Sequence, residues 1–115
     1  MNLSEKQQAF SICLARLITH LVSEGYGVTL GEAYRPQEMA DIYAKEGKGI
    51  RNSLHTMRLA VDLNLFKAGE FLTEKDAYGP AGEFWESLST DDFECCWGGR
   101  FNDSDHFSIS HGGIK

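Results

Sequence analysis

The chain lacks the features that mark membrane proteins and nucleic-acid-binding proteins. No apolar run approaches the ~20 residues that a bilayer-spanning helix needs. Acidic residues outnumber basic ones by 17 to 11, and the formal net charge of -6 opposes binding to nucleic acid or to an anionic membrane surface. The first six residues also lack the basic and then apolar pattern of a signal peptide. We therefore expect synthesis in the cytoplasm, no membrane insertion and no nucleic-acid partner.

Cysteine is sparse as well. The chain has three cysteines, which are Cys13 and the adjacent pair Cys95 and Cys96. An odd count with two neighbours does not suggest a disulfide framework. The adjacent pair also lacks the two-residue spacer of a zinc knuckle. We predict that these thiols are buried as small apolar groups.

The length of 115 residues, with 42% hydrophobic residues, predicts one domain spanning residues 1–115. Helical spacing of apolar residues predicts helices over residues 3–24, 36–46 and 80–88, with Ser4 as the first N-cap. Alternation predicts strands over residues 26–34, 59–66 and 106–110, a hairpin turn at residues 67–70, and an extended segment at residues 93–97. The order and the short connections predict an α+β fold, a small antiparallel sheet packed with a few helices.

Two segments carry the residues suited to catalysis. His55, Asp62 and His106 could ligate a metal, and Asp103 precedes His106 by three residues. Zinc hydrolases need three protein ligands, an open position for water and a base that takes its proton. Asp62 is the one charged residue in an otherwise apolar strand, and a buried charge needs a partner. A cation supplies one; a nearby backbone segment capped by Asp62 is the alternative.

The spacing of His55 and Asp62 restricts how they can share an ion. Seven residues of strand would separate them by ~23 Å on opposite faces, and seven residues of helix would leave ~10 Å of rise. The chain must therefore turn back between His55 and Leu59. Asp103 is expected in the turn before the last strand, where it can act as a base, whereas Asp105 is expected to point away into solvent.

At these residues the sequence resembles a known family. The pattern Ser53-x-His55-x-x-Arg58-x-Ala60-x-Asp62 resembles the Ser-x-His-x-x-Gly-x-Ala-x-Asp motif of the D-Ala-D-Ala metallopeptidase and VanY-like carboxypeptidase family. The Trp97-Gly98-Gly99 segment followed by Asp103 and His106 is similar to that family's second motif. With Arg35-Pro36, the resemblance spans residues 28–110. Short chains of the family are similar to phage endolysins that cut the L-alanyl-D-glutamate bond of peptidoglycan stem peptides.

The resemblance implies a role for each matching residue. It implies that His55, Asp62 and His106 ligate Zn²⁺, that Asp103 is the catalytic carboxylate and that Arg35 stabilises the developing oxyanion. Ser53 matches the motif serine, a contact to the substrate or to a ligand. A surface ion pair with Glu32 or Glu38 is the alternative for Arg35. The sequence departs from the motif at Arg58, where the family usually has glycine.

The expected function is therefore a zinc metallopeptidase acting on peptidoglycan stem peptides as a phage lysis enzyme. The expected protein is a monomer made in the host cytoplasm that reaches the periplasmic wall after release. One alternative is a D-alanyl-D-alanine carboxypeptidase or dipeptidase, which would use the same ligands. The other is a non-catalytic zinc-binding module, against which the presence of both Asp103 and Arg35 argues.

Overall fold

The computed structural model describes all residues, 1–115, as an α+β domain, which confirms the predicted fold class. Three α-helices accompany a five-stranded antiparallel sheet. The helices are α1 (Leu3–Ser23), α2 (Gln37–Lys45) and α3 (Lys75–Ser87). The strands are β1 (Tyr26–Leu30), β2 (Ala60–Lys67), β3 (Glu70–Phe71), β4 (Cys95–Trp97) and β5 (His106–Ile109). Two single-turn 3-10 helices, η1 (Leu54–Met57) and η2 (Gly98–Phe101), precede β2 and β5.

Strand β2 is the centre of the sheet. The strand order is β1-β2-β5-β4, and β3 pairs with β2 as well. On the edge of β2 opposite β1, β5 pairs with residues 60–62 and β3 pairs with residues 66–67. Residues 63–65 therefore have no strand beside them on that edge, and the amide of Leu63 instead donates to the carbonyl of Asp105 at 2.9 Å.

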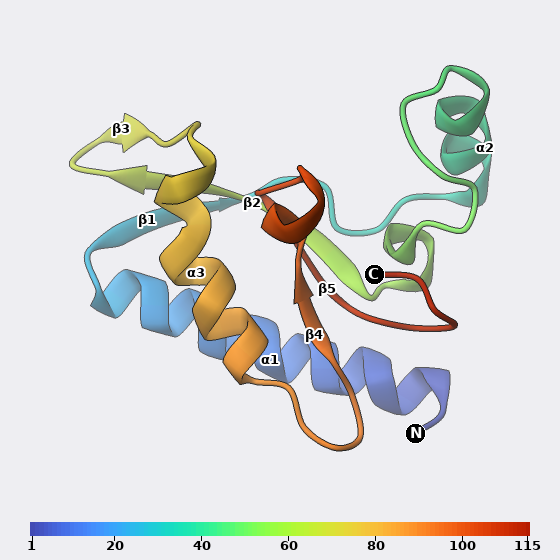
Figure 1. Cartoon of the computed structure of the whole chain (residues 1–115), viewed down its shortest axis with the longest axis horizontal. Helices are drawn as coiled ribbons and strands as arrows, with labels where there is room; N and C mark the ends of the chain where they lie inside the picture. The colour runs from blue at the N-terminus through green and yellow to red at the C-terminus, as the bar shows by residue number, and fades with distance from the viewer.

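Alternation along β2 separates the core from the opposite face of the sheet. Leu59, Val61, Leu63 and Leu65 are fully buried in the main apolar cluster, whereas Asp62 and Asn64 are half-buried on the other face. Helices α1 and α3 and strands β4 and β5 supply most of the rest of that cluster. Helix α2 lies at the opposite end of the molecule from the β2–β3 hairpin (Figure 1).

Two helix starts differ from the predictions. The N-cap of α1 is Asn2, not Ser4: its side chain accepts from the amide of Glu5 at 2.8 Å, and Glu5 returns a bond to the amide of Asn2. Helix α3 begins at Lys75, so Pro80 lies inside it. Proline there removes only the bond to the carbonyl of Asp76, an exposed residue whose carbonyl water can satisfy.

Strand β1 is shorter than predicted, because its regular pairing ends at Leu30. The backbone continues beside β2, with the amide of Gly31 donating to the carbonyl of Asp62 at 2.7 Å and the amide of Asp62 donating to the carbonyl of Glu32 at 2.8 Å. The segment after β1 is thereby fixed against the middle of β2.

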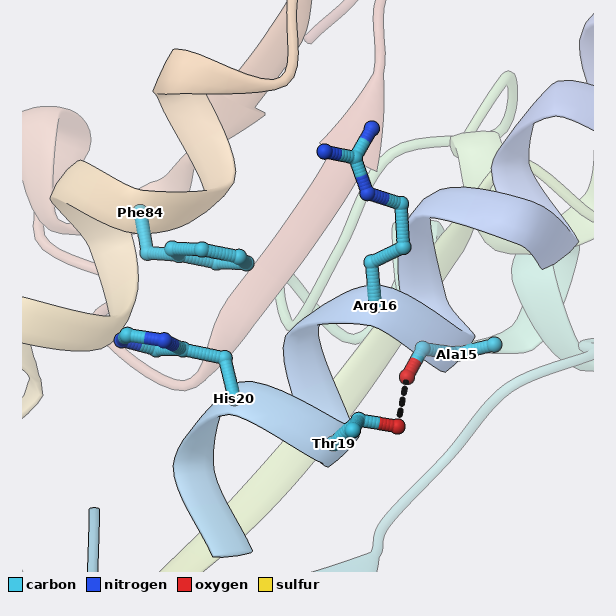
Figure 2. A pocket seen from close by; sticks show the side chains of 5 residues that line it. All are labelled: Ala15, Arg16, Thr19, His20 and Phe84. Carbon is cyan, nitrogen blue, oxygen red and sulfur yellow. Dashed lines mark hydrogen bonds between the residues drawn. The ribbon is translucent and has the colours of Figure 1, made fainter. Parts of the chain in front are cut away.

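A hollow of about 380 Å³ lies between α1 and α3, on the helical side of the molecule. His20 and Phe84 line this hollow, and their rings stack with centroids 3.9 Å apart (Figure 2). All three cysteines are free and buried, as predicted. None of the helices combines the length and the apolar composition that a bilayer crossing requires.

Candidate metal centre

The sheet register brings Asp62 and His106 together. They are directly opposite each other in the β2–β5 ladder, so their side chains share one face. Oδ1 of Asp62 lies 3.7 Å from Nδ1 of His106. The pair is therefore a consequence of strand pairing between segments that are far apart in the sequence.

A sharp reversal of the chain adds His55 to this pair. His55 lies in η1, and the hydroxyl of Ser53 caps that turn by accepting from the amide of His55 at 3.2 Å. The turn ends at Arg58, which is left-handed with φ 57° and ψ 35°. This confirms the predicted reversal between His55 and Leu59 and places Nε2 of His55 3.4 Å from Oδ1 of Asp62.

Arg58 stands where the resembling motif has glycine, and its backbone explains the motif. Glycine adopts the left-handed backbone conformation at the lowest energetic cost of any residue. Arg58 adopts it nonetheless, and its guanidinium lies 4.0 Å from the centroid of the Tyr34 ring. The substitution thus keeps the backbone turn and adds a cation–π contact.

The ring of His55 is oriented by the segment after β1. Its Nδ1 lies 3.0 Å from the carbonyl oxygen of Ala33, so Nδ1 carries the proton and donates. Nε2 is then left with a lone pair facing Asp62. Metal-binding histidines are commonly held in this way by a carbonyl behind the ring.

The three side chains fit a metal ion. One ligand atom from each of His55, Asp62 and His106 lies within 4.8 Å of the others. Ligand atoms around a tetrahedral zinc ion are about 3.3 Å apart, given bonds of about 2.0 Å. Oδ1 of Asp62 is also buried without any hydrogen-bond partner. A buried acceptor in this state is costly, and a cation between the three residues would satisfy it.

The electrostatics of the cluster favour a charged carboxylate. Burial opposes ionisation of Asp62, but the nearby imidazoles of His106 and His55 outweigh it and lower the pKa of Asp62 to about 2. Burial likewise opposes protonation of His55, yet the neighbouring carboxylate of Asp62 outweighs it and raises the pKa of His55. In the absence of a metal, the site therefore favours a proton on His55.

The turn before β5 carries Asp103 beside the cluster. Its Oδ2 lies 3.7 Å from Nδ1 of His106, and about half of the side chain is exposed (52%). The amide of Asp103 donates to the carbonyl of Gly98 at 2.9 Å, and the amide of His106 donates to the carbonyl of Asp103 at 3.0 Å. Asp103 is thus fixed at its backbone and open to solvent at its carboxylate.

Trp97 and its two glycines hold this turn in place. The indole Nε1 of Trp97 donates to the carbonyl of Ser104 at 2.7 Å. A Cβ on Gly98 would lie 2.0 Å from the carbonyl oxygen of Asp103 and 2.7 Å from Cβ of His106. A Cβ on Gly99 would meet the Trp97 ring at 2.1 Å. The Trp-Gly-Gly sequence is therefore required by close contact and not only by turn flexibility.

Arg35 lies next to His55 but is already paired. Its amide donates to the carbonyl of His55 at 3.0 Å. Its guanidinium forms an ion pair with Glu32, with Nε 2.9 Å from Oε1, and lies 5.0 Å from the centroid of the Tyr43 ring. Arg35 thus forms the ion pair with Glu32 that was the alternative to a catalytic role, and it also lies next to His55 of the cluster.

Asp105 is closer to the cluster than the sequence suggested. Burial and the neighbouring carboxylates of Asp62 and Asp103 raise its pKa to about 6. Asp105 was expected to point into solvent. It belongs to the turn before β5, so the alternation of side chains along that strand does not apply to it. The partial burial of Asp105 beside two other carboxylates is visible only in three dimensions.

Comparison with known proteins supports the fold. No protein-family model matches the sequence, and no curated protein matches it. Among solved structures, the chain is similar to the crystal structure of the Serratia marcescens L-Ala D-Glu endopeptidase ChiX, with a TM-score of 0.67 and 20% sequence identity. The match covers 93% of this chain and 85% of that one. At this level of identity, the similarity establishes the fold of the chain.

Proposed function

We propose that the protein is a zinc-dependent peptidoglycan endopeptidase that hydrolyses the L-alanyl-D-glutamate bond of stem peptides. The observation that carries the proposal is the convergence of His55, Asp62 and His106, with the carboxylate of Asp103 beside them. The shared fold with an L-Ala D-Glu endopeptidase supports the choice of bond.

Zinc is the metal that this donor set suits best. Two imidazole nitrogens and one carboxylate oxygen are typical of catalytic zinc sites, which keep a fourth position open. Zinc bound there supplies a Lewis acid that polarises the scissile carbonyl and makes water a better nucleophile near neutral pH.

The chain's own groups divide the remaining work. Asp103 accepts the proton of the attacking water at its exposed carboxylate and passes it to the leaving amine. Arg35 lies on the other side of His55, where its guanidinium stabilises negative charge developing on the carbonyl oxygen. For this role the guanidinium must share its hydrogen bonds between Glu32 and the substrate.

In biological terms, we propose a monomeric phage lysis enzyme that is made in the host cytoplasm and acts on the periplasmic wall after release. Its partner is then the peptidoglycan stem peptide. The sequence resemblance to phage endolysins supports this biological setting.

The decisive experiment is digestion of purified peptidoglycan with and without a chelator, followed by identification of the new termini. An endopeptidase of this type exposes the carboxyl group of L-Ala and the amino group of D-Glu, whereas a D-alanyl-D-alanine carboxypeptidase releases D-Ala. No new termini under metal-replete conditions would support a non-catalytic zinc module.

Asp103→Ala tests the assigned base. We expect it to bind zinc as the parent does and to lose at least 100-fold in kcat, since general acid–base catalysis contributes roughly 10²–10⁴-fold. Asp91→Ala, in an exposed turn elsewhere, is the matched control. Full activity of Asp103→Ala would refute the role.

A further inference from the structure

A polar groove lies beside the candidate metal centre, at the edge of β2 that has no strand neighbour. Its volume is about 300 Å³, and it lies between the β2–β3 hairpin and the turn before β5. Its lining offers amides, a hydroxyl, an aromatic ring and carboxylates. These groups belong to Asn64 and Asn102, Thr73, Phe71, and Asp103 and Asp105.

The groove continues directly from the metal cluster. Asp62 and Asn64 are two residues apart on β2, so they lie on the same face and about 7 Å apart. Asp103 is shared, because it lines the groove and also lies 3.7 Å from the ring of His106. A molecule bound at the cluster can therefore extend along β2 toward Phe71 without leaving the surface.

The side chains of the groove are free to bind a ligand. The hydroxyl of Tyr78 is already engaged with the backbone of Leu65 and Leu72. In contrast, the side chains of Asn64, Thr73 and Asn102 form no hydrogen bond within the chain. Phe71 leaves about half of its surface exposed (53%), with the Phe66 ring beside it at 5.4 Å between centroids.

The charge of the groove selects against anions. Asp103 and Asp105 line it, and no basic side chain does. Arg35 lies on the other side of the cluster, because it follows β1, which pairs with the opposite edge of β2. The two sides of the bond to be cut thus meet different electrostatic surroundings.

We propose that this groove binds the N-acetylated sugar to which the stem peptide is attached. A sugar has an apolar face that packs on an exposed aromatic ring, and hydroxyl and acetamido groups that bond to amides and hydroxyls. The inference rests on the proposed function, because it assigns the sugar and L-Ala side of the bond to the groove. The carboxylate-bearing D-Glu side then lies toward Arg35.

The kinetic test compares a muramoyl-linked stem peptide with the same peptide lacking the sugar. We expect the parent protein to prefer the sugar-linked substrate in kcat/KM, and Phe71→Ala to lower that preference about tenfold, equivalent to 1.4 kcal/mol. Phe71→Tyr keeps the ring and should keep the preference. Ile12→Ala, exposed on α1, is the control. An equal loss for both substrates in Phe71→Ala, or an unchanged preference, would overturn the proposal.

A binding measurement separates this inference from the proposed catalysis. We would titrate the zinc-loaded protein with N-acetylmuramoyl-L-alaninamide, which has no bond to cleave, and follow backbone amide shifts by NMR. Shifts at Asn64, Phe71 and Thr73 that vanish in Phe71→Ala support the groove, even if wall hydrolysis is absent. Wall hydrolysis with shifts confined to the surroundings of Arg35 would reject the groove and leave the catalytic proposal standing.

Discussion

The two faces of the sheet are built from alternate residues of the same strands, yet they have opposite chemistry. Val61 and Phe107 point into the helical side and are fully buried among apolar groups. Asp62 and His106, their immediate neighbours, point to the other side, where they lie 3.7 Å from each other. Asp62 and the terminal Lys67 are the two charged residues of β2.

Histidine shows the contrast within one residue type. His20, between α1 and α3, stacks on Phe84 and has no carboxylate partner among the ion pairs (Figure 2). His106 lies next to Asp62 and Asp103. The helical face therefore uses histidine as a flat packing surface, whereas on the other face His106 is one of three side chains that could hold a metal ion. The apolar core that stabilises the fold and the polar cluster suited to chemistry therefore lie on opposite sides of one sheet.

The largest expected effect comes from Asp62→Ala. Removal of the carboxylate leaves two imidazoles without the anion that holds a cation between them. Loss of a residue that only orients a ligand lowers metal affinity about 10–100-fold. Asp62 would be a ligand itself, so we expect zinc affinity to fall by more than about 100-fold and peptidase activity to be lost. Metal content after dialysis measures this. His20→Ala, on the helical face, should keep its metal; equal metal loss in both variants would contradict the separation of the two faces.

A pair of glycine substitutions tests each face. The Cβ of Gly98→Ala would collide with the turn that carries Asp103, and the Cβ of Gly82→Ala would meet the Trp97 ring at 2.1 Å. Overpacking typically costs 1–3 kcal/mol, so we expect each variant to lose about 2 kcal/mol in chemical denaturation. Only Gly98→Ala also presses on His106, so its zinc affinity should fall further than that of Gly82→Ala. The reverse order would show that the Trp97 contact governs the site.

Chelated protein should be more stable at weakly acidic pH, whereas the stabilisation that zinc provides should be larger at about pH 8. In chelated protein the pKa of Asp62 is lowered to about 2, so its contribution is present above its usual value of 3.8 and is lost as pH falls toward 2. The pKa of His55 is raised above 6.5, so its contribution is present below that value and is lost as pH rises through the folded pKa. Chelated protein should therefore be most stable in weakly acidic solution.

Zinc binding needs neutral imidazoles, so zinc should stabilise the protein more at about pH 8 than at about pH 5. Thermal unfolding at both values, with zinc and with chelator, measures both effects. A chelated protein whose Tm rises steadily from about pH 5 to about pH 8 would contradict the assigned pairing of His55 with Asp62.

The smallest effect is expected for Arg58→Gly. Glycine relieves the left-handed backbone at φ 57° but raises the entropy of the unfolded chain and removes the contact with Tyr34. These opposing terms are each about 1 kcal/mol, so the net change in unfolding free energy should stay below about 1 kcal/mol. Arg58→Ala keeps the strain and loses the contact, so it should be the less stable of the two.

Much of the fold could be predicted from local patterns. Alternation predicted strand β2 and helical spacing predicted the helix over residues 3–24, and both elements are present, with Phe10, Cys13, Leu17 and Leu21 as the buried residues of α1. The start of α3 was wrong because proline signals a helix start more often than an interior position, and exposure of the first turn removed most of the cost here. The N-cap of α1 was wrong because Asn2 and Ser4 are both good caps, and only the bonds with Glu5 decide between them.

The site was less accessible to sequence reasoning. The reversal after His55 followed from distance alone, and the local pair of Glu32 and Arg35 was among the alternatives that the sequence offered. The setting of Asp105 depends instead on which segments the sheet brings together. The groove along β2 had no sequence signal, because it exists only where β5 and β3 leave residues 63–65 without a strand neighbour.

The sequence by itself determined which residues face the core, because periodic burial of apolar side chains needs no knowledge of distant segments. It also determined that His55 and Asp62 can meet only across a turn, since chain geometry fixes how far seven residues reach. The position of Asp62 opposite His106, and the open polar groove that runs from them along β2, depend on the folded chain as a whole. Register and pairing between strands more than forty residues apart depend on the packing of the whole chain, so local pattern does not encode them.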